Sequence, residues 1–547
     1  MLNRGKYLLI GGAAVLASAA LVMAALAAPT TIAPPSSTVA ESARIDELVE
    51  GHLKWAGLPV AGASSDEVFL RRVYLDVIGV LPTAAEARAF LGDSDREKRR
   101  KLIDQLLERP EFADYWSLKW ADLLRIKAEY PVNLWPKGAA AYYRWVRESL
   151  RANKPYDQFV REMLLATGSD FRDGPANFYR AVNKKDPQSH AESAALLFMG
   201  VRLNCARCHD APNTKWTPQD NLGMAAFFGQ VKFKATGEWK EEIVYVDPRQ
   251  TFNNPSGHKP VTPKFLDGAE VKLETGQDGR AVFAAWLTTA ENPWFSRNIV
   301  NRVWSWLLDR GLVEPPDDMR ASNPPSNPKL LDYLAERLAA HHWDLKQTYR
   351  MILNSRTYQR SSEMAGATPA GDVNFARYLP RRLPAEVLVD AMSRVTETTQ
   401  TYQSDIPEPY TRLVDWPAVK VADGSITSPM LELLGRPARN TSQELERTSD
   451  LTARQTMFLL NSNEVERMLR EGGRLNRLKA EAHGGTVVLS RTIIEDLFLA
   501  SFSRYPTAQE RERLEGLMNA RPPAQQLEAA RDLMWAILNS PEFVFNH

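Results

Sequence analysis

Cysteine is almost absent from this chain, which has only two in 547 residues. A scaffold held by several disulfides is therefore excluded, and so is a zinc site made of four thiolates. Excess charge is missing too, because 68 basic residues face 67 acidic ones and leave a net charge of +1. Bulk electrostatics therefore favour neither a nucleic acid nor another polyanion as a partner.

Three common enzyme fingerprints are also missing. The sequence has no G-x-S-x-G nucleophile elbow, no P-loop and no G-x-G-x-x-G dinucleotide motif. Their absence counts against a standard hydrolase, a nucleotide enzyme and a nicotinamide-dependent oxidoreductase. Whether the chain is an enzyme at all stays open at this point.

Long apolar runs are missing except at the N-terminus. Arg4 and Lys6 precede an almost unbroken apolar stretch over 7–26, which ends in small residues. This pattern predicts an export signal over 1–28, with an uncleaved membrane anchor as the alternative. Residues 29–42 are rich in proline, serine and threonine and predict a linker. We therefore expect an exported protein of the periplasm or cell surface, with no membrane contact except a possible N-terminal anchor.

Helical periodicity dominates the rest of the chain. The expected fold class is mostly α, with helical domains over 43–237 and 276–547. A connector over 238–275 is expected to be rich in loops and β-structure, because it combines a strand-like run at 243–246 with several prolines.

Several helix starts are marked by capping boxes. In a capping box, a Ser or Thr side chain accepts from the backbone N–H three residues later, and a Glu or Gln side chain at that later position accepts from the backbone N–H of the Ser or Thr. Thr83 with Glu86 forms one such pattern, and residues 507–510 repeat it near the end of the chain. Ser189 with Glu192 predicts a third start, for the helix that precedes the two cysteines.

The two cysteines stand in the pentapeptide Cys205-Ala206-Arg207-Cys208-His209. C-x-x-C-H is the attachment pattern of c-type haem. Two thiols one helical turn apart can add to the two vinyl groups of a porphyrin, and the adjacent imidazole can ligate the iron. We expect the preceding helix to carry both thiols on one face near its end. A structural thiol pair, an isolated disulfide or a structural zinc site are the alternatives.

A six-coordinate haem also needs a distal ligand, and several side chains qualify. Met224 is the leading candidate, because it lies fifteen residues beyond His209 on a predicted short helix. Met199, His190 and His258 are alternatives. An open distal position would instead suit the binding of small molecules or peroxidatic chemistry rather than electron transfer alone.

Several segments of the sequence together resemble a known pair of exported domains: a planctomycete-type cytochrome-like domain and the C-terminal domain that usually follows it. In the first half the resemblance is carried by residues 69–76, 79–83, 198–209, 215–217 and 225–228. In the second half it is carried by residues 292–295, 298, 300–302, 304, 311–312, 323–326, 381–386 and 535–540. The family has no settled activity, so the resemblance implies architecture more than chemistry.

The sequence departs from the family pattern at two places, and each departure argues against a further metal or redox centre. Ala211 stands where the family often has a second histidine, and no cysteine accompanies Glu446-Arg447 after the Gly435-Arg436-Pro437 phrase. No second metal or redox centre that uses those groups is expected here.

The sequence thus predicts a c-type-cytochrome-like protein with one covalent haem held by Cys205, Cys208 and His209. Its expected role is electron transfer, or redox support of an extracytoplasmic process, with a redox partner or within a larger exported assembly. One alternative is a zinc-binding or scaffold protein at the cell surface. The other is an enzyme acting on an extracellular polymer, whose C-terminal domain would place Asp317 and Asp318 in its cleft.

Overall fold

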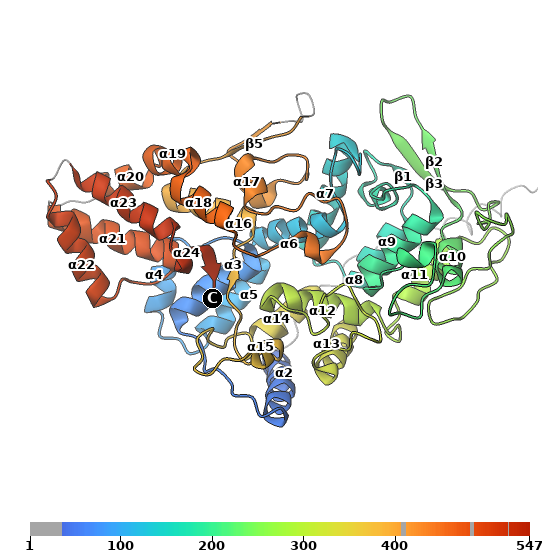
Figure 1. Ribbon diagram of the computed structural model, residues 1–547, viewed down its shortest axis with the longest axis horizontal. Helices are drawn as coiled ribbons and strands as arrows, with labels where there is room; N and C mark the ends of the chain where they lie inside the picture. The colour runs from blue at the N-terminus through green and yellow to red at the C-terminus, as the bar shows by residue number, and fades with distance from the viewer. Residues whose placement is uncertain (1–34, 406–411, 482–485, 523–524) are drawn as a thin grey trace, which may run out of the picture.

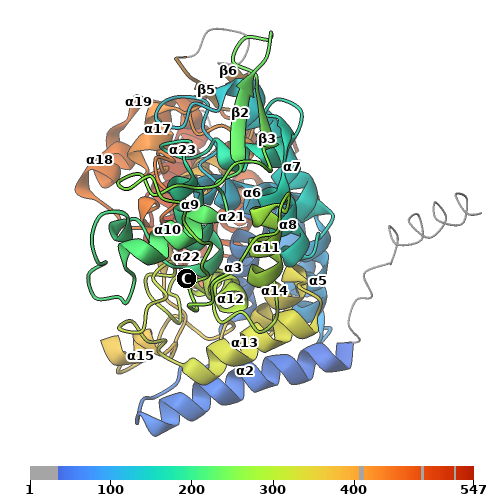
Figure 2. The ribbon, with the colours of Figure 1, turned by 90° about the vertical axis from the view of Figure 1, so that its right-hand side faces the viewer.

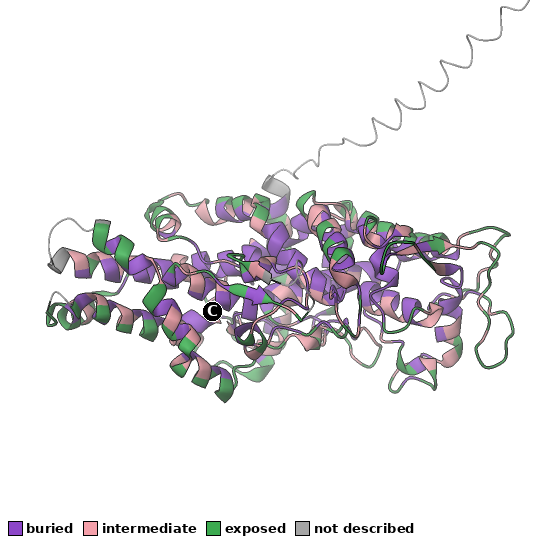
Figure 3. Cartoon of the chain, turned by 90° about the horizontal axis from the view of Figure 1, so that it is seen from above, coloured by how far each residue is buried: buried purple, intermediate pink, exposed green. Residues whose placement is uncertain are grey.

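The computed structural model describes residues 35–405, 412–481, 486–522 and 525–547. The prediction of a mostly helical chain is confirmed, with only three small sheets in the described part. The molecule is elongated, and buried side chains run through its whole length (Figure 3). No helix within the described ranges is long and apolar enough to cross a membrane. The signal or anchor predicted over 1–28 lies outside these residues.

The helices of the first half surround the centre and right-hand side of Figure 1. They are α2 (Pro35–Trp55), α3 (Asp66–Ile78), α4 (Ala84–Gly92), α5 (Lys98–Glu108), α6 (Pro110–Leu123), α7 (Trp135–Arg151), α8 (Tyr156–Leu165), α9 (Pro187–Met199) and α10 (Pro218–Ala226).

The helices of the second half return through the centre and then extend to the left. They are α11 (Gly279–Leu287), α12 (Phe295–Leu308), α13 (Pro328–Ala340), α14 (Leu345–Leu353), α15 (Pro369–Val373), α16 (Ala385–Thr396), α17 (Pro429–Leu433), α18 (Ala453–Asn461), α19 (Asn463–Glu471), α20 (Arg474–Glu481), α21 (Thr486–Phe502), α22 (Ala508–Asn519), α23 (Gln526–Leu538) and α24 (Pro541–Val544).

The strand-like run predicted at 243–246 is confirmed as β3 (Glu242–Val246). It pairs antiparallel with β2 (Val231–Ala235) and with the short β1 (Gly168–Ser169), in the order β1-β3-β2. The other sheets join β4 (Arg381–Arg382) to β7 (Phe545–Asn546), and β5 (Thr401–Gln403) to β6 (Arg412–Val414).

The start of α2 differs from the predicted linker, because residues 35–42 are helical. Tertiary contacts account for the difference. The Ser42 hydroxyl donates to the Met351 carbonyl at 2.9 Å, and the Gln347 amide donates to the Thr38 hydroxyl at 3.1 Å. Figure 2 shows α2 lying along α13 at the edge of the molecule. Packing of this kind stabilises a helix that composition alone does not favour.

Two of the three predicted capping boxes are confirmed. Thr83 and Thr507 each accept from the backbone three residues on, and the glutamates at those positions bond back. The prediction at Ser189 is wrong, because α9 begins one turn earlier. Asp186 is its N-cap, with Pro187 at the first helical position. An aspartate cap followed by proline is an equally strong start signal, and it takes precedence here.

Helix α3 joins the two halves of the chain through its buried polar side chains. The Arg71 guanidinium donates to the Phe543 carbonyl at 2.7 Å. Arg72 donates to the carbonyls of residues 358 and 360, and its guanidinium lies 3.7 Å from the centroid of the Tyr378 ring. Helix α3 thus contacts segments of the second half that lie hundreds of residues further along the chain.

Asp76 is the centre of this junction. One carboxylate oxygen accepts from Arg381 at 2.6 Å and from Asn546 at 2.7 Å. The other accepts from the hydroxyls of Tyr358 at 2.9 Å and Tyr378 at 3.0 Å. The Asp76 side chain is 3% exposed. A buried carboxylate with a full set of donors is stable only while all of its partners stay in place.

We expect Asp76→Ala to lower the free energy of unfolding by about 3–5 kcal/mol, because it leaves a buried arginine without its counter-charge. Urea denaturation followed by circular dichroism measures the loss. Asp372→Ala is the matched control, since it breaks a partly exposed aspartate–arginine pair with Arg377 within the same half. That control should lose about 1 kcal/mol or less. Equal losses in the two variants would contradict a special role for Asp76.

Candidate functional site

The two cysteines lie on a short turn of their own. Helix α9 ends at Met199, and Gly200 follows with a left-handed φ of 66°. The expectation that α9 carries both thiols is therefore wrong: Cys205–Arg207 forms a separate single 3-10 turn. A Cβ at Gly200 would lie 2.8 Å from both Asn298 Oδ1 and Met319 Cγ, so the close approach of the second half also favours glycine there.

The turn is anchored by the two residues between the cysteines. Ala206 is fully buried. The Arg207 guanidinium bonds Glu192 and Asp186, each at 2.9 Å, near the start of α9. Cys205, Cys208 and His209 are exposed, and both thiols are free. The buried side of the turn thus belongs to Ala206 and Arg207, and the three motif residues face outward.

The His209 ring has one nitrogen engaged. Its Nδ1 lies 2.8 Å from the carbonyl oxygen of Asp210. A carbonyl only accepts, so Nδ1 must carry the proton. In the neutral imidazole, the lone pair then lies on Nε2. This is the tautomer in which a histidine ligates a metal through Nε2 while a backbone carbonyl orients the ring.

The structure does not bring the leading distal candidate to His209. Met224 is fully buried in α10, whereas His209 is exposed. Helix α10 does contact the Cys205–Arg207 turn, but the Met224 side chain belongs to the core. Met199 is fully buried as well, and His258 lies on an exposed loop.

His190 is also committed to the core. It is 1% exposed, and its Nε2 lies 3.0 Å from the Tyr179 carbonyl. Burial lowers the pKa of this imidazole to about 4. The ring is therefore neutral over the physiological range, and its contacts are those of a structural residue.

The donor set at the motif fits haem attachment better than it fits zinc. Within the described ranges, no three His, Cys, Asp or Glu side chains converge closely enough to hold a metal ion. Zinc needs such convergence. Haem attachment needs only two thiols one turn apart and a free imidazole nitrogen, and the motif offers these. Cys205, Cys208 and His209 are all exposed, so a porphyrin attached to them would lie at the surface.

Asp317 and Asp318 do not form the cleft expected for a polymer-cleaving enzyme. Asp317 is fully buried; one of its oxygens pairs with Arg202, and the other accepts from the Glu444 backbone N–H at 3.2 Å. Asp318 is also buried and pairs with Arg320. Both carboxylates hold the loop to its neighbours and are not presented to a substrate.

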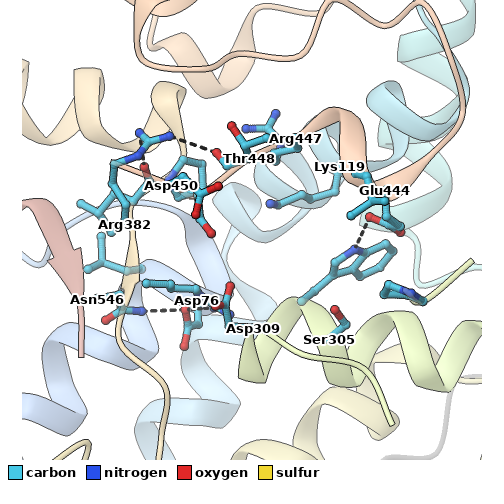
Figure 4. A pocket seen from close by; sticks show the side chains of 18 of the residues that line it. Asp76, Lys119, Ser305, Asp309, Arg382, Glu444, Arg447, Thr448, Asp450 and Asn546 are labelled. Atoms are coloured by element: carbon cyan, nitrogen blue, oxygen red, sulfur yellow. Dashed lines mark hydrogen bonds and ion pairs between the residues drawn. The ribbon is translucent and has the colours of Figure 1, made fainter. Parts of the chain in front are cut away.

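A polar cavity of about 310 Å³ lies elsewhere, between the two halves of the chain (Figure 4). Its walls come from α3, α6, α12, β4, β7 and the segment 444–450. The polar and aromatic residues that line it are Asp76, Tyr115, Lys119, Ser305, Trp306, Asp309, Glu314, Arg381, Arg382, Glu444, Arg447, Thr448, Ser449, Asp450 and Asn546.

Sequence reasoning missed this cavity, although one signal was present. Lys119 is the only charged residue in the stretch from Tyr115 to Ala121. A lysine on the apolar face of a helix is unusual enough to suggest a special environment. The side chains that face Lys119 across the cavity could not be identified from the sequence, since they come from segments about two to three hundred residues further along the chain.

Comparisons with known proteins match both halves to family models. Residues 44–233 match PSCyt2, and residues 279–518 match PSD1. Each is described as a protein of unknown function, DUF1549 and DUF1553 respectively. Neither a curated protein nor a solved structure matches the chain.

His190 gives a pH-dependent prediction. Its pKa is about 4 in the folded chain and 6.5 when unperturbed. Between pH 4 and pH 6.5 the imidazole is therefore protonated more in the unfolded state than in the folded state. Stability should therefore fall as the pH drops below 6.5, by about 2 kcal/mol between about pH 7 and pH 5. Urea denaturation of His190→Gln should show a smaller pH dependence than the wild type. His258→Gln, on the exposed loop, is the control and should leave the dependence unchanged. Identical pH profiles for all three proteins would refute the assignment.

Proposed function

Because the chain belongs to the planctomycete-type family that joins a PSCyt2 domain to a PSD1 domain, as its motifs predicted, we propose that it is a cytochrome-like protein that carries one covalent c-type haem. Cys205 and Cys208 supply the thioether bonds, and His209 supplies the proximal nitrogen. The bound haem provides a one-electron redox centre. The chain's own residues hold it, orient its axial ligand and leave it accessible.

The observation that carries this proposal is the orientation of the His209 ring. The bond from Nδ1 to the Asp210 carbonyl leaves Nε2 with its lone pair, and no residue in the described ranges bonds to that nitrogen. An exposed histidine with no such role would exchange freely between its two tautomers. Here the backbone of the next residue selects the one suited to iron.

The exposure of the two thiols supports the same reading. Covalent attachment requires access to both sulfur atoms, and Cys205 and Cys208 are both exposed and free. Arg207 stays ion-paired behind them, so the turn can keep its anchor while both cysteines react. By contrast, a structural zinc would need ligands that the described residues do not bring together.

The exposed position of the motif also bears on how the protein works. A haem held by these exposed residues would be accessible to another molecule, which suits electron exchange with a redox partner or a neighbouring subunit of an exported assembly. Haem attachment outside the cytoplasm agrees with the N-terminal export pattern at 1–28. Both the partner and the location belong to the proposal.

We expect the full chain, produced with its own signal in a host that matures c-type cytochromes, to give a covalent pyridine haemochrome spectrum with one haem per chain. Cys205→Ser combined with Cys208→Ser should lose it, because no thiol remains to form a thioether. Met224→Leu is the matched control, since it changes a buried sulfur but keeps volume and both thiols. That variant should retain covalent haem.

A colourless wild-type protein, from cells in which another c-type cytochrome matures normally, would contradict the proposal. One zinc per chain in that colourless protein would favour the structural-metal alternative instead.

A further inference from the structure

The cavity between the two halves contains charged groups that the fold leaves without partners. Most charges around it are neutralised. Arg381 pairs with Asp76 at 2.6 Å, and Arg447 pairs with both Asp122 and Glu386 at 2.7 Å. Glu444 is held by Arg302. Arg382 has no carboxylate partner, but its guanidinium donates to the carbonyls of Leu383 and Thr448, each at 3.0 Å.

Lys119, Asp309 and Asp450 are the exceptions. None of the three side chains forms a hydrogen bond or ion pair with another residue in the described part of the chain. Lys119 is half-buried, with its ammonium 5.8 Å from the centroid of the Tyr115 ring, whereas Asp309 and Asp450 are exposed. Lys119 enters from α6, Asp309 from the end of α12 and Asp450 from the segment after Arg447. In Figure 4 the ends of these side chains surround the same opening. Their charges are close enough for Lys119 and Asp450 to act on the pKa of Asp309.

The pKa values of two of these groups are also shifted. Burial and the positive charge of Arg447 lower the pKa of Lys119 to about 8. Desolvation by the cavity wall raises the pKa of Asp309, although the residue as a whole is exposed. An amine and a carboxyl whose pKa values are shifted toward neutrality are common at functional sites, although ion-pair networks can cause the same shifts.

The free groups select the chemistry of a ligand. An anionic ligand would face two unpaired carboxylates, and the arginines are already occupied. A cationic ligand would face Lys119 and the arginine-lined wall. A neutral hydroxyl group satisfies both kinds of neighbour, because it donates to a carboxylate and accepts from an ammonium.

The rest of the wall suits the same ligand. The Trp306 indole lines the cavity beside the Ser305 hydroxyl, and its Nε1 is already engaged by Glu444 at 3.4 Å. An aromatic wall offers an apolar surface to the C–H groups of a sugar ring. A volume of about 310 Å³ lies at the lower end of small-ligand pockets, which begin at about 300 Å³.

We propose that this cavity binds a neutral sugar unit, with its hydroxyl groups shared between Lys119, Asp309 and Asp450. The site is built by both domains, since Lys119 belongs to the first and the two carboxylates to the second. It does not depend on haem attachment, and neither Asp317 nor Asp318 lines it. The fold would therefore combine a redox motif with a separate recognition site.

The binding test is saturation-transfer NMR on the full chain with glucose, galactose, mannose, xylose and fucose at millimolar concentration. At least one of these sugars should receive saturation. Lys119→Met and Asp309→Asn should each weaken binding of that sugar about tenfold or more, because each removes a charge-assisted hydrogen bond. Asparagine keeps the left-handed backbone that residue 309 adopts, with φ 63°. Lys101→Met, on the exposed face of α5, is the matched control and should bind as the wild type does.

The melting temperature of the same variants separates recognition from a structural role. An unpaired, desolvated ammonium destabilises the fold, so Lys119→Met should raise the melting temperature while it weakens sugar binding. A structural lysine would give the opposite result, with a lower melting temperature. Saturation of none of the five sugars, unchanged binding in Lys119→Met, or a lower melting temperature in that variant would each overturn the proposal.

Discussion

The carboxylate of Asp76 is the interaction on which the rest of this structure depends. It comes from the last turn of α3 in the first domain, yet its donors are Tyr358, Tyr378, Arg381 and Asn546. Burying a carboxylate is unfavourable unless every lone pair is used. The four donors therefore have to assemble together, and in doing so they bring the middle and the end of the second half against α3. The two domains are distinct in sequence but share one polar junction.

Helix α12 extends this junction to both candidate sites. Asn298 donates to the Leu197 carbonyl at 2.8 Å, and Arg302 donates to the Leu196 carbonyl at 3.1 Å. These bonds satisfy carbonyls in the last turn of α9, which leads into the cysteine-bearing turn. Arg302 also holds Glu444 on the cavity wall. One helix of the second domain thus fixes the approach to the motif and one side of the cavity.

Local signals in the sequence predicted the local parts of this fold. The capping boxes at Thr83 and Thr507, the strand at 243–246 and the helical character of both halves depend on neighbouring residues and are confirmed. The start of α9 was misplaced because two competing caps lie three residues apart. The helical start of α2 was missed because its stability comes from α14, about three hundred residues away.

The same difference between local and long-range contacts explains which parts of the candidate sites the sequence could predict. Cys205, Cys208 and His209 are adjacent in sequence, so spacing alone identified them; their outward orientation depends on Arg207 and α9 and could not be read from spacing. The cavity has no continuous motif. Lys119 meets carboxylates from far along the chain, and only the junction at Asp76 places them around one opening.

The two sites share one physical property, which is that the fold does not need their functional groups. At the motif, Ala206 and Arg207 provide the contacts that hold the turn, and the thiols and imidazole make no contribution to the core. In the cavity, Arg381 and Arg447 are neutralised by carboxylates and Arg382 donates to backbone carbonyls. The Lys119 ammonium has no hydrogen-bond or ion-pair partner among the described residues, at a cost in solvation. Side chains that break the local rules of packing and pairing, in a chain that otherwise follows them, mark the places where sequence serves something other than folding.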